Sequence, residues 1–130
     1  MRLAGKRAIV VGAGQTPGDT IGNGRAIATL FAREGARVLC VDRIGERAEA
    51  TATEIGGAAF EADITSADAC AAIITETNTR FGGLDILINN VGIGGGGDGP
   101  AHLADEAAFD RIMSVNLKGA WLTIKAATAA

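Results

Sequence analysis

Short apolar runs alternate with amphipathic stretches along this chain, with no visible linker between them. The apolar runs predict strands buried on both faces, at residues 8–11, 37–41, 58–62 and 84–88. Between them apolar residues recur at helical spacing, which predicts helices from near 24 to 35, from 46 to 55, and from 65 or 66 to 82. Strands that alternate with helices predict an α/β fold with a doubly wound parallel sheet.

The residues at the ends of these helices support the boundaries. Gly35 follows the first helix where a left-handed cap would sit, and glycines at 56–57 and 82–83 stop the other two. Thr65 or Ser66 can cap the third helix, because a hydroxyl oxygen accepts from the free N–H groups of a first turn.

After residue 88 the pattern changes to a glycine-dominated loop over 89–100. From Asp105 onward apolar residues step by three or four positions, which predicts one long helix or two abutting helices to the end. The apolar positions are Phe109, Ile112, Met113, Leu117, Trp121 and Ile124. Trp121 is interpreted as a core or subunit-interface residue rather than a ligand contact.

Length and composition indicate one globular domain, taken as residues 1–130, since 48% of the residues are hydrophobic and 21% charged. A net charge of −3 argues against nucleic acid or an anionic membrane as the main partner. No stretch could span a bilayer, and the N-terminal apolar run is too short for a signal peptide. Cys40 and Cys70 lack the spacing of metal ligands, so no metal site is expected. Buried free thiols are the interpretation, and they suit a cytoplasmic protein.

The first strand and the first helix are joined by a turn with glycines at 12, 14, 18, 22 and 24. The first N–H groups of a helix lack intrahelical partners, and the peptide dipoles place roughly half a positive charge there. A glycine lets a phosphate approach such groups, because a side chain would keep it away. On its own, such a turn fits a phosphate site or merely a loop.

Ligands of doubly wound sheets bind outside the carboxyl ends of the strands, where this chain has Gly12, Asp42, Asp63 and Asn90. The acidic residue that contacts an adenosine ribose is expected ~20 residues after the first glycine of the turn. Asp42 lies farther than that from Gly12, and the long turn accounts for the excess. Its carboxylate would accept from both ribose hydroxyls and repel a 2′-phosphate, which favours NAD over NADP. Arg43 weakens that preference, because a guanidinium could accommodate the phosphate. A solvated acid at a strand end is the alternative for Asp42.

Four segments, in this order, resemble motifs of the short-chain dehydrogenase/reductase family, and the resemblance covers essentially the whole chain. VGAG…GNGRAIA resembles the family's TGxxxGxG cofactor loop, and EADIT resembles its adenine-contacting Asp segment. LDILINNVG is similar to its NNAG motif, and SVNLKGA to its helix with a catalytic asparagine. The resemblance implies a Rossmann-type dinucleotide-binding fold truncated after about four strands, with 84–88 left as an exposed edge.

The resemblance implies that thirteen positions contact the pyrophosphate, ribose, adenine or nicotinamide half of the cofactor. They are Gly12, Gly14, Gly22, Asn23, Gly24, Asp42, Arg43, Asp63, Ile64, Asn90, Val91, Gly92 and Val115. Asn116 matches the family's catalytic asparagine, which orders a water in a proton relay. Alternatively, Asn116 could kink its helix or bond a neighbouring backbone. Asn89 is expected to brace neighbouring strands, and His102 to be a solvated loop residue.

Three features depart from the family's pattern. Val11 stands where the family has threonine, so one hydroxyl hydrogen bond between loop and sheet is missing. The glycine turn carries six extra residues, most simply Gln15 to Thr20, which could reach over the pyrophosphate as a flap or form a bulge of no consequence. The chain has no tyrosine and ends before the family's catalytic serine and Tyr-x-x-x-Lys, and Lys118 and Lys125 lie on the wrong helix to substitute.

The prediction is an NAD-dependent oxidoreductase, with NADP less favoured, that interconverts a small-molecule alcohol and a ketone in the complete protein. This chain would bind the cofactor without turnover. It would also self-associate, because an exposed strand edge invites pairing and Trp121 and Leu122 would lack neighbours. A non-enzymatic NAD-binding module or partner subunit is the alternative. A phosphate-loop NTPase is disfavoured, since no Gly-Lys-Ser/Thr follows the glycines.

Overall fold

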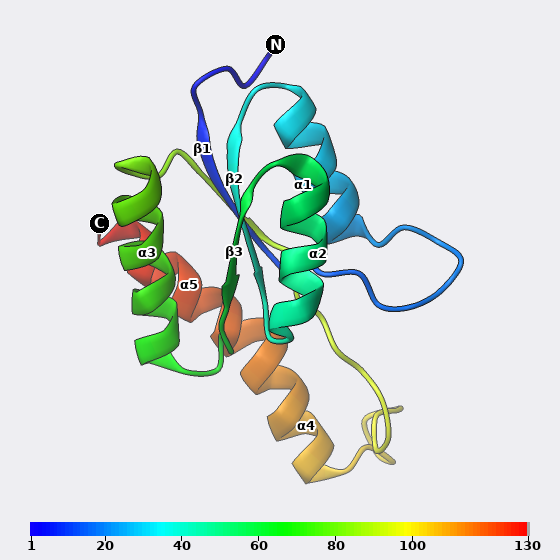
Figure 1. Ribbon diagram of the computed structural model, residues 1–130. Coiled ribbons are helices and arrows are strands. Elements are labelled where there is room, and N and C mark those ends of the chain that lie inside the picture. The colour runs from blue at the N-terminus through cyan, green and yellow to red at the C-terminus, as the bar shows by residue number, and fades with distance from the viewer. Residues whose placement is uncertain (130) are drawn as a thin grey trace.

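Four parallel strands in the order β3-β2-β1-β4 form the centre of the molecule in a computed structural model that describes residues 1–129 (Figure 1). The strands are β1 (Arg7–Val11), β2 (Arg37–Asp42), β3 (Ala58–Glu61) and β4 (Ile86–Asn89). The predicted doubly wound parallel sheet is therefore confirmed, and β4 lies at its edge, as expected.

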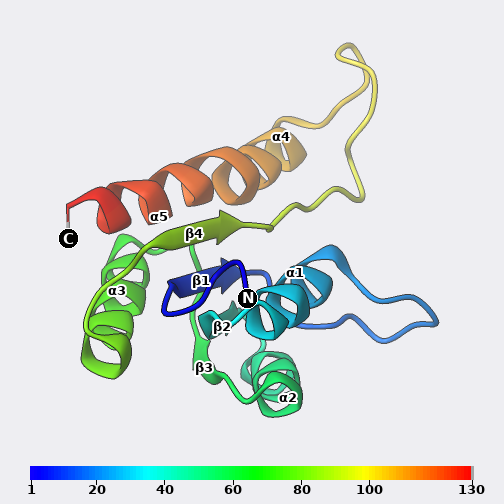
Figure 2. The same ribbon diagram turned by 90° about the horizontal axis from the view of Figure 1, so that it is seen from above.

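Helices cover both faces of the sheet (Figure 2). They are α1 (Asn23–Arg33), α2 (Gly45–Ile55), α3 (Ala67–Phe81), α4 (Glu106–Met113) and α5 (Gly119–Thr128), with a π turn, η1 (Ser114–Lys118), between the last two. Val10 and Cys40 point to the face of α1 and α2, whereas Ile9 and Leu39 pack toward α3 and α5. Because successive strand residues bury opposite faces, β1 and β2 need the continuous apolar runs that the sequence shows.

Most helix ends lie where the sequence predicts them. Gly56 (φ 69°) ends α2 and Gly82 (φ 77°) ends α3, both in the left-handed conformation that glycine adopts without a Cβ clash. Of the two predicted caps for α3, Ser66 is the one used, and its hydroxyl accepts from the N–H of Ala69 at 3.2 Å.

The predicted C-terminal helical segment runs without a break through α4, η1 and α5, so it is a long helix with a π turn inside it. Leu122 corrects one expectation, because it lies in the core with residues of α3 instead of lacking neighbours. Trp121 is 53% exposed, so of its two interpretations the core residue is excluded and the subunit-interface residue stays a prediction. No helix within residues 1–129 is long and apolar enough to cross a membrane.

Both cysteines are free and buried, as predicted. Cys40 lies on β2 and Cys70 on α3, each inside the core. Burial raises the pKa of the Cys40 thiol to about 12, because the thiolate would lose its hydration.

Candidate functional site

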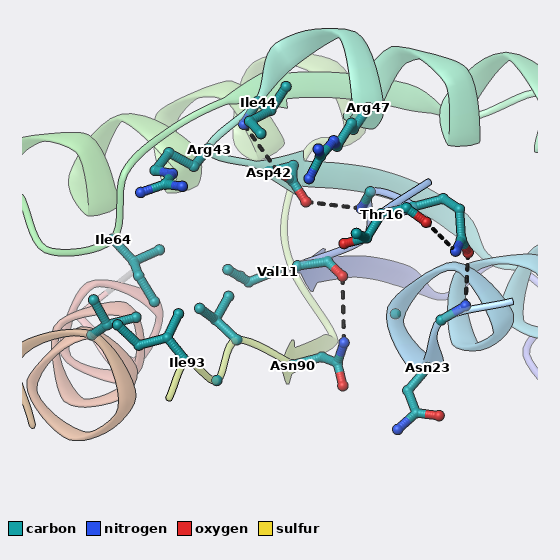
Figure 3. A pocket seen from close by; sticks show the side chains of 18 of the residues that line it. Val11, Thr16, Asn23, Asp42, Arg43, Ile44, Arg47, Ile64, Asn90 and Ile93 are labelled. Carbon is teal, nitrogen blue, oxygen red and sulfur yellow. Dashed lines mark hydrogen bonds between the residues drawn. The ribbon is translucent and has the colours of Figure 1, made fainter. Parts of the chain in front are cut away.

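A cleft of about 600 Å³ opens at the carboxyl ends of β1, β2 and β4 (Figure 3). All thirteen positions singled out from the sequence as cofactor contacts line this cleft, from Gly12 to Val115. They come together because the carboxyl ends of parallel strands meet at one edge of the sheet. The exposed His102 is not among the lining residues.

The turn after β1 and the start of α1 approach each other without room for a side chain. A Cβ on Gly24 would lie 1.9 Å from the carbonyl oxygen of Gly12 and 2.8 Å from Nδ2 of Asn90. Gly12 has φ +79°, and a Cβ there would lie 2.3 Å from the carbonyl oxygen of Asn90. The glycines therefore let β1, β4 and α1 meet at the base of the cleft.

Asp42 holds the turn with its carboxylate. Oδ2 accepts from the N–H of Gly14 at 3.0 Å, and Oδ1 accepts from the N–H of Ile44 at 2.9 Å. A Cβ on Gly14 would lie 2.5 Å from Oδ2, so only glycine permits this approach. Asp42 is half-buried and bonded, and is not merely a solvated acid. Each oxygen keeps further acceptor capacity, which faces the cleft.

Asp63 and Ile64, just after the end of β3, have different structural roles. Oδ1 of Asp63 accepts from the backbone N–H and the hydroxyl of Thr65 at 2.9 and 2.7 Å. These hydrogen bonds lower the pKa of the Asp63 carboxyl. Ile64 is 6% exposed. A Cβ on Gly119 would lie 2.8 Å from Cδ1 of Ile64, so the glycine leaves room for this side chain. Asp63 thus shapes the turn, while Ile64 supplies an apolar wall.

Asn116 lies in η1 and binds the loop after β4. Its Oδ1 accepts from the N–H of Ile93 at 2.8 Å, and its Nδ2 donates to the carbonyl oxygen of Ile93 at 2.9 Å. Of the two structural alternatives raised from the sequence, the bond to a neighbouring backbone is therefore present. Val115 beside it lines the cleft, whereas a catalytic role of Asn116 stays a prediction.

Two hydrogen bonds around the site differ from expectation. Asn89 does not brace neighbouring strands with its side chain, because its Oδ1 accepts from the hydroxyl of Thr123 on α5 at 2.7 Å. Val11 has no hydroxyl to offer the loop, and a hydroxyl bond to the loop comes from α2. Thr51 of α2 is buried and donates to the carbonyl oxygen of Ala13 at 2.9 Å.

Sequence reasoning missed several lining residues. Arg47 lies five positions after Asp42, in the first turn of α2, and its Cβ lies where Gly14 leaves space (Figure 3). Arg111 of α4 also lines the cleft and donates from Nη2 to the carbonyl oxygen of Gly96 at 3.1 Å. A basic residue in the first turn of the helix that follows a strand-end acid was a usable signal for Arg47. Nothing in the sequence places Arg111 at this site.

The chain that forms this cleft belongs to a known family. The short chain dehydrogenase family matches residues 6–130, so the chain is a member of that family of oxidoreductases. Its sequence is 44% identical over 117 residues to 2-(S)-hydroxypropyl-CoM dehydrogenase 3 of Xanthobacter autotrophicus, covering 86% of this chain and 45% of that protein.

Solved structures of the family share the fold. A short chain dehydrogenase from Mycobacterium smegmatis superposes with a TM-score of 0.88 at 31% identity, over 98% of this chain and 53% of that one. A 3-ketoacyl-(acyl-carrier-protein) reductase from Brucella melitensis, complexed with NADH, superposes with a TM-score of 0.84 at 38% identity, over 95% and 48%. The chain thus spans about half the length of its relatives.

Proposed function

We propose that residues 1–130 are the dinucleotide-binding domain of an oxidoreductase and that the cleft holds NAD(H). The observation that carries this proposal is the cradle of glycines at 12, 14 and 24, which line the cleft and where an added Cβ would collide with neighbouring protein atoms. The NADH complex of the Brucella reductase supports it by analogy. Saturable binding of NADH to the chain is the test.

The start of α1 suits the pyrophosphate. Gly22 is an extended N-cap that has no side chain to cap the helix, and the side-chain oxygen nearby, Oε1 of Gln15, accepts from the N–H of Gly22 itself. The next N–H groups along the helix belong to Asn23 and Gly24. They also have no intrahelical acceptor, and the helix dipole favours an anion beside them. These two residues line the cleft next to the glycine cradle. The chain's own backbone would therefore bind and orient the diphosphate.

Asp42 supports NAD over NADP. Two backbone N–H groups fix its carboxylate at the cleft wall, where the remaining lone pairs can accept from ribose hydroxyls. A fixed negative charge repels a 2′-phosphate, whereas Arg43 and Arg47 at the same wall would attract one. We expect the carboxylate to dominate, because the glycine turn forms around it.

In the complete protein we propose hydride transfer between NAD(H) and a small-molecule alcohol or ketone. The bound nicotinamide would supply or accept the hydride. Residues 90–92 and Val115 would orient its ring from the cleft wall, while Asn116 would hold the loop and order a water. The chain has no tyrosine to exchange a proton with the substrate oxygen. The 130-residue chain should therefore not turn over, and measurable alcohol oxidation by it would refute this part.

A non-enzymatic NAD-binding module or partner subunit is the second candidate. The coding frame beyond residue 130 distinguishes the two. A following serine strand and a Tyr-x-x-x-Lys helix would establish the enzyme, whereas a stop codon would favour the module. We place either protein in the cytoplasm, which the two free, buried thiols support.

We further propose that the chain is a homo-oligomer that pairs through α4 and α5, which lie on the outside of the molecule (Figure 2). Phe109, Leu117 and Trp121 are 57%, 65% and 53% exposed, with Met113 between them. Residues four apart drift around an α-helix of 3.6 residues per turn. The extra residue of the π turn offsets that drift and keeps the row on one face.

The charges on this face are complementary to those of a second copy of the chain. Asp110 and Lys118 border the same shallow surface pocket, one on each side of Ser114. Antiparallel pairing about Ser114 would set Asp110 of one copy beside Lys118 of its partner. We expect light scattering to show a dimer that Asp110→Lys weakens and that Asp110→Lys with Lys118→Asp restores. A monomer at every concentration would contradict the proposal.

A further inference from the structure

The inserted residues 15–20 form part of the cleft instead of a bulge remote from it. Figures 1 and 2 show this segment leaving the end of β1 as an extended loop that returns to the start of α1. Five of its residues line the cleft: Gln15, Thr16, Pro17, Gly18 and Thr20. The segment's only acid, Asp19, is exposed and is not among the lining residues. The wall that the insertion adds is therefore polar and carries no carboxylate.

One side chain holds this loop together. Oε1 of Gln15 accepts from the N–H of Gly22 at 2.7 Å. Its Nε2 donates to the carbonyl oxygens of Thr16 and Thr20, at 2.7 and 2.8 Å. A single carboxamide thus ties the beginning and end of the insertion to the N-cap of α1. Because three bonds converge on one group, the loop has a defined shape before any ligand arrives.

Two residues of this segment with a hydroxyl line the cleft, Thr16 and Thr20. Thr16 is the one that lies between Asp42 and the start of α1 at Asn23 (Figure 3). Its contact with Gln15 uses the backbone carbonyl, so the hydroxyl is not spent on that contact. A hydroxyl donates to a phosphate oxygen, and hydrogen bonds to charged groups are stronger than neutral ones.

We propose that residues 15–20 are an added phosphate-binding wall, in which Thr16 contacts the diphosphate of the dinucleotide and Gln15 is the positioning residue. The inference rests on the proposed NAD(H) site and extends it to a segment that the family's cofactor loop lacks. The loop is thus a fixed part of the binding site and adds a side-chain donor to the backbone N–H groups of α1.

Fluorescence titration with NADH, and its displacement by ADP and by adenosine, tests the proposal on the 130-residue chain. We expect Thr16→Val to raise the Kd for NADH and the inhibition constant of ADP about tenfold, with adenosine unchanged. Thr16→Ser keeps the hydroxyl and should bind as the wild type does. Gln15→Ala should weaken NADH and ADP by a similar factor. Thr75→Val, an exposed threonine of α3, is the matched control and should change nothing.

The outcomes separate the two proposals. If the wild-type chain does not bind NADH, the proposed function itself fails. If it binds NADH and Thr16→Val stays within twofold of it, the added wall is refuted while the function stands. An equal loss for adenosine and ADP would also overturn the inference, because it would indicate collapse of the whole cleft. Thr16→Val decides the matter even if Gln15→Ala does not fold, since it leaves the three Gln15 bonds intact.

Discussion

Replacing Gly24 by alanine should damage both the fold and the site. The new Cβ would lie 1.9 Å from the carbonyl oxygen of Gly12, where ordinary van der Waals contact begins at 3.4 Å. The obstructing atom belongs to the backbone and not to the end of a flexible side chain, so we place the cost at about 3 kcal/mol, the upper part of the range for overpacking. Alanine in a helix gains about 1 kcal/mol over glycine, which leaves a net loss of about 2 kcal/mol.

Urea and thermal unfolding at one fixed protein concentration measure this loss. We expect the melting midpoint of Gly24→Ala to fall by about 5–10 °C and its NADH binding to weaken at least about tenfold, since the turn must open to admit the methyl group. Gly99→Ala is the control, because a Cβ there meets nothing within 4 Å and Gly99 does not line the cleft. If Gly24→Ala and Gly99→Ala behaved alike, the close packing of the turn on α1 would be refuted.

Three further predictions concern the supports of the site and the core. Thr51→Val should lower the free energy of unfolding by about 1–3 kcal/mol, because the carbonyl of Ala13 loses its hydrogen-bond donor. Thr51→Ser keeps the hydroxyl and should not lower it. Equal urea midpoints for the two variants would contradict this. Hydrogen bonds from the Arg7 side chain and backbone lower the pKa of the Asp85 carboxyl to about 2. Its unfolded value is about 3.9, so this stabilisation is present above pH ~4 and is lost as the pH falls toward 2. Asp85→Asn should therefore make the free energy of unfolding depend less on pH between about 4 and 2. The same pH dependence as in the wild type would contradict this. Cys40 should react with a thiol reagent only on unfolding, and fast labelling of the native chain would argue against its burial.

Where local chemistry decides the structure, the sequence was sufficient. Ser66 and Gly82 bracket α3 because each supplies a conformation or bond that other residue types supply poorly. The apolar runs required strands covered on both faces, and alternation with helices required them to be parallel. The positions of the candidate site follow from the same logic, since strand ends converge at one edge.

What the sequence did not reveal are contacts between side chains and distant backbone. The bond from Thr51 to Ala13 spans 38 residues, and no periodicity encodes it. The π turn was also hidden, because a residue spacing of four is compatible with an ordinary helix. The bonds of Gln15 depend on how the insertion folds back, which spacing alone leaves open.

Equilibrium titration of the 130-residue chain with NADH and with NADPH tests the central claim most directly. The glycine cradle and the fixed carboxylate of Asp42 predict saturable binding of both, with NADH the tighter ligand. No binding of either would contradict the cleft as a dinucleotide site, and tighter binding of NADPH would contradict the role of Asp42.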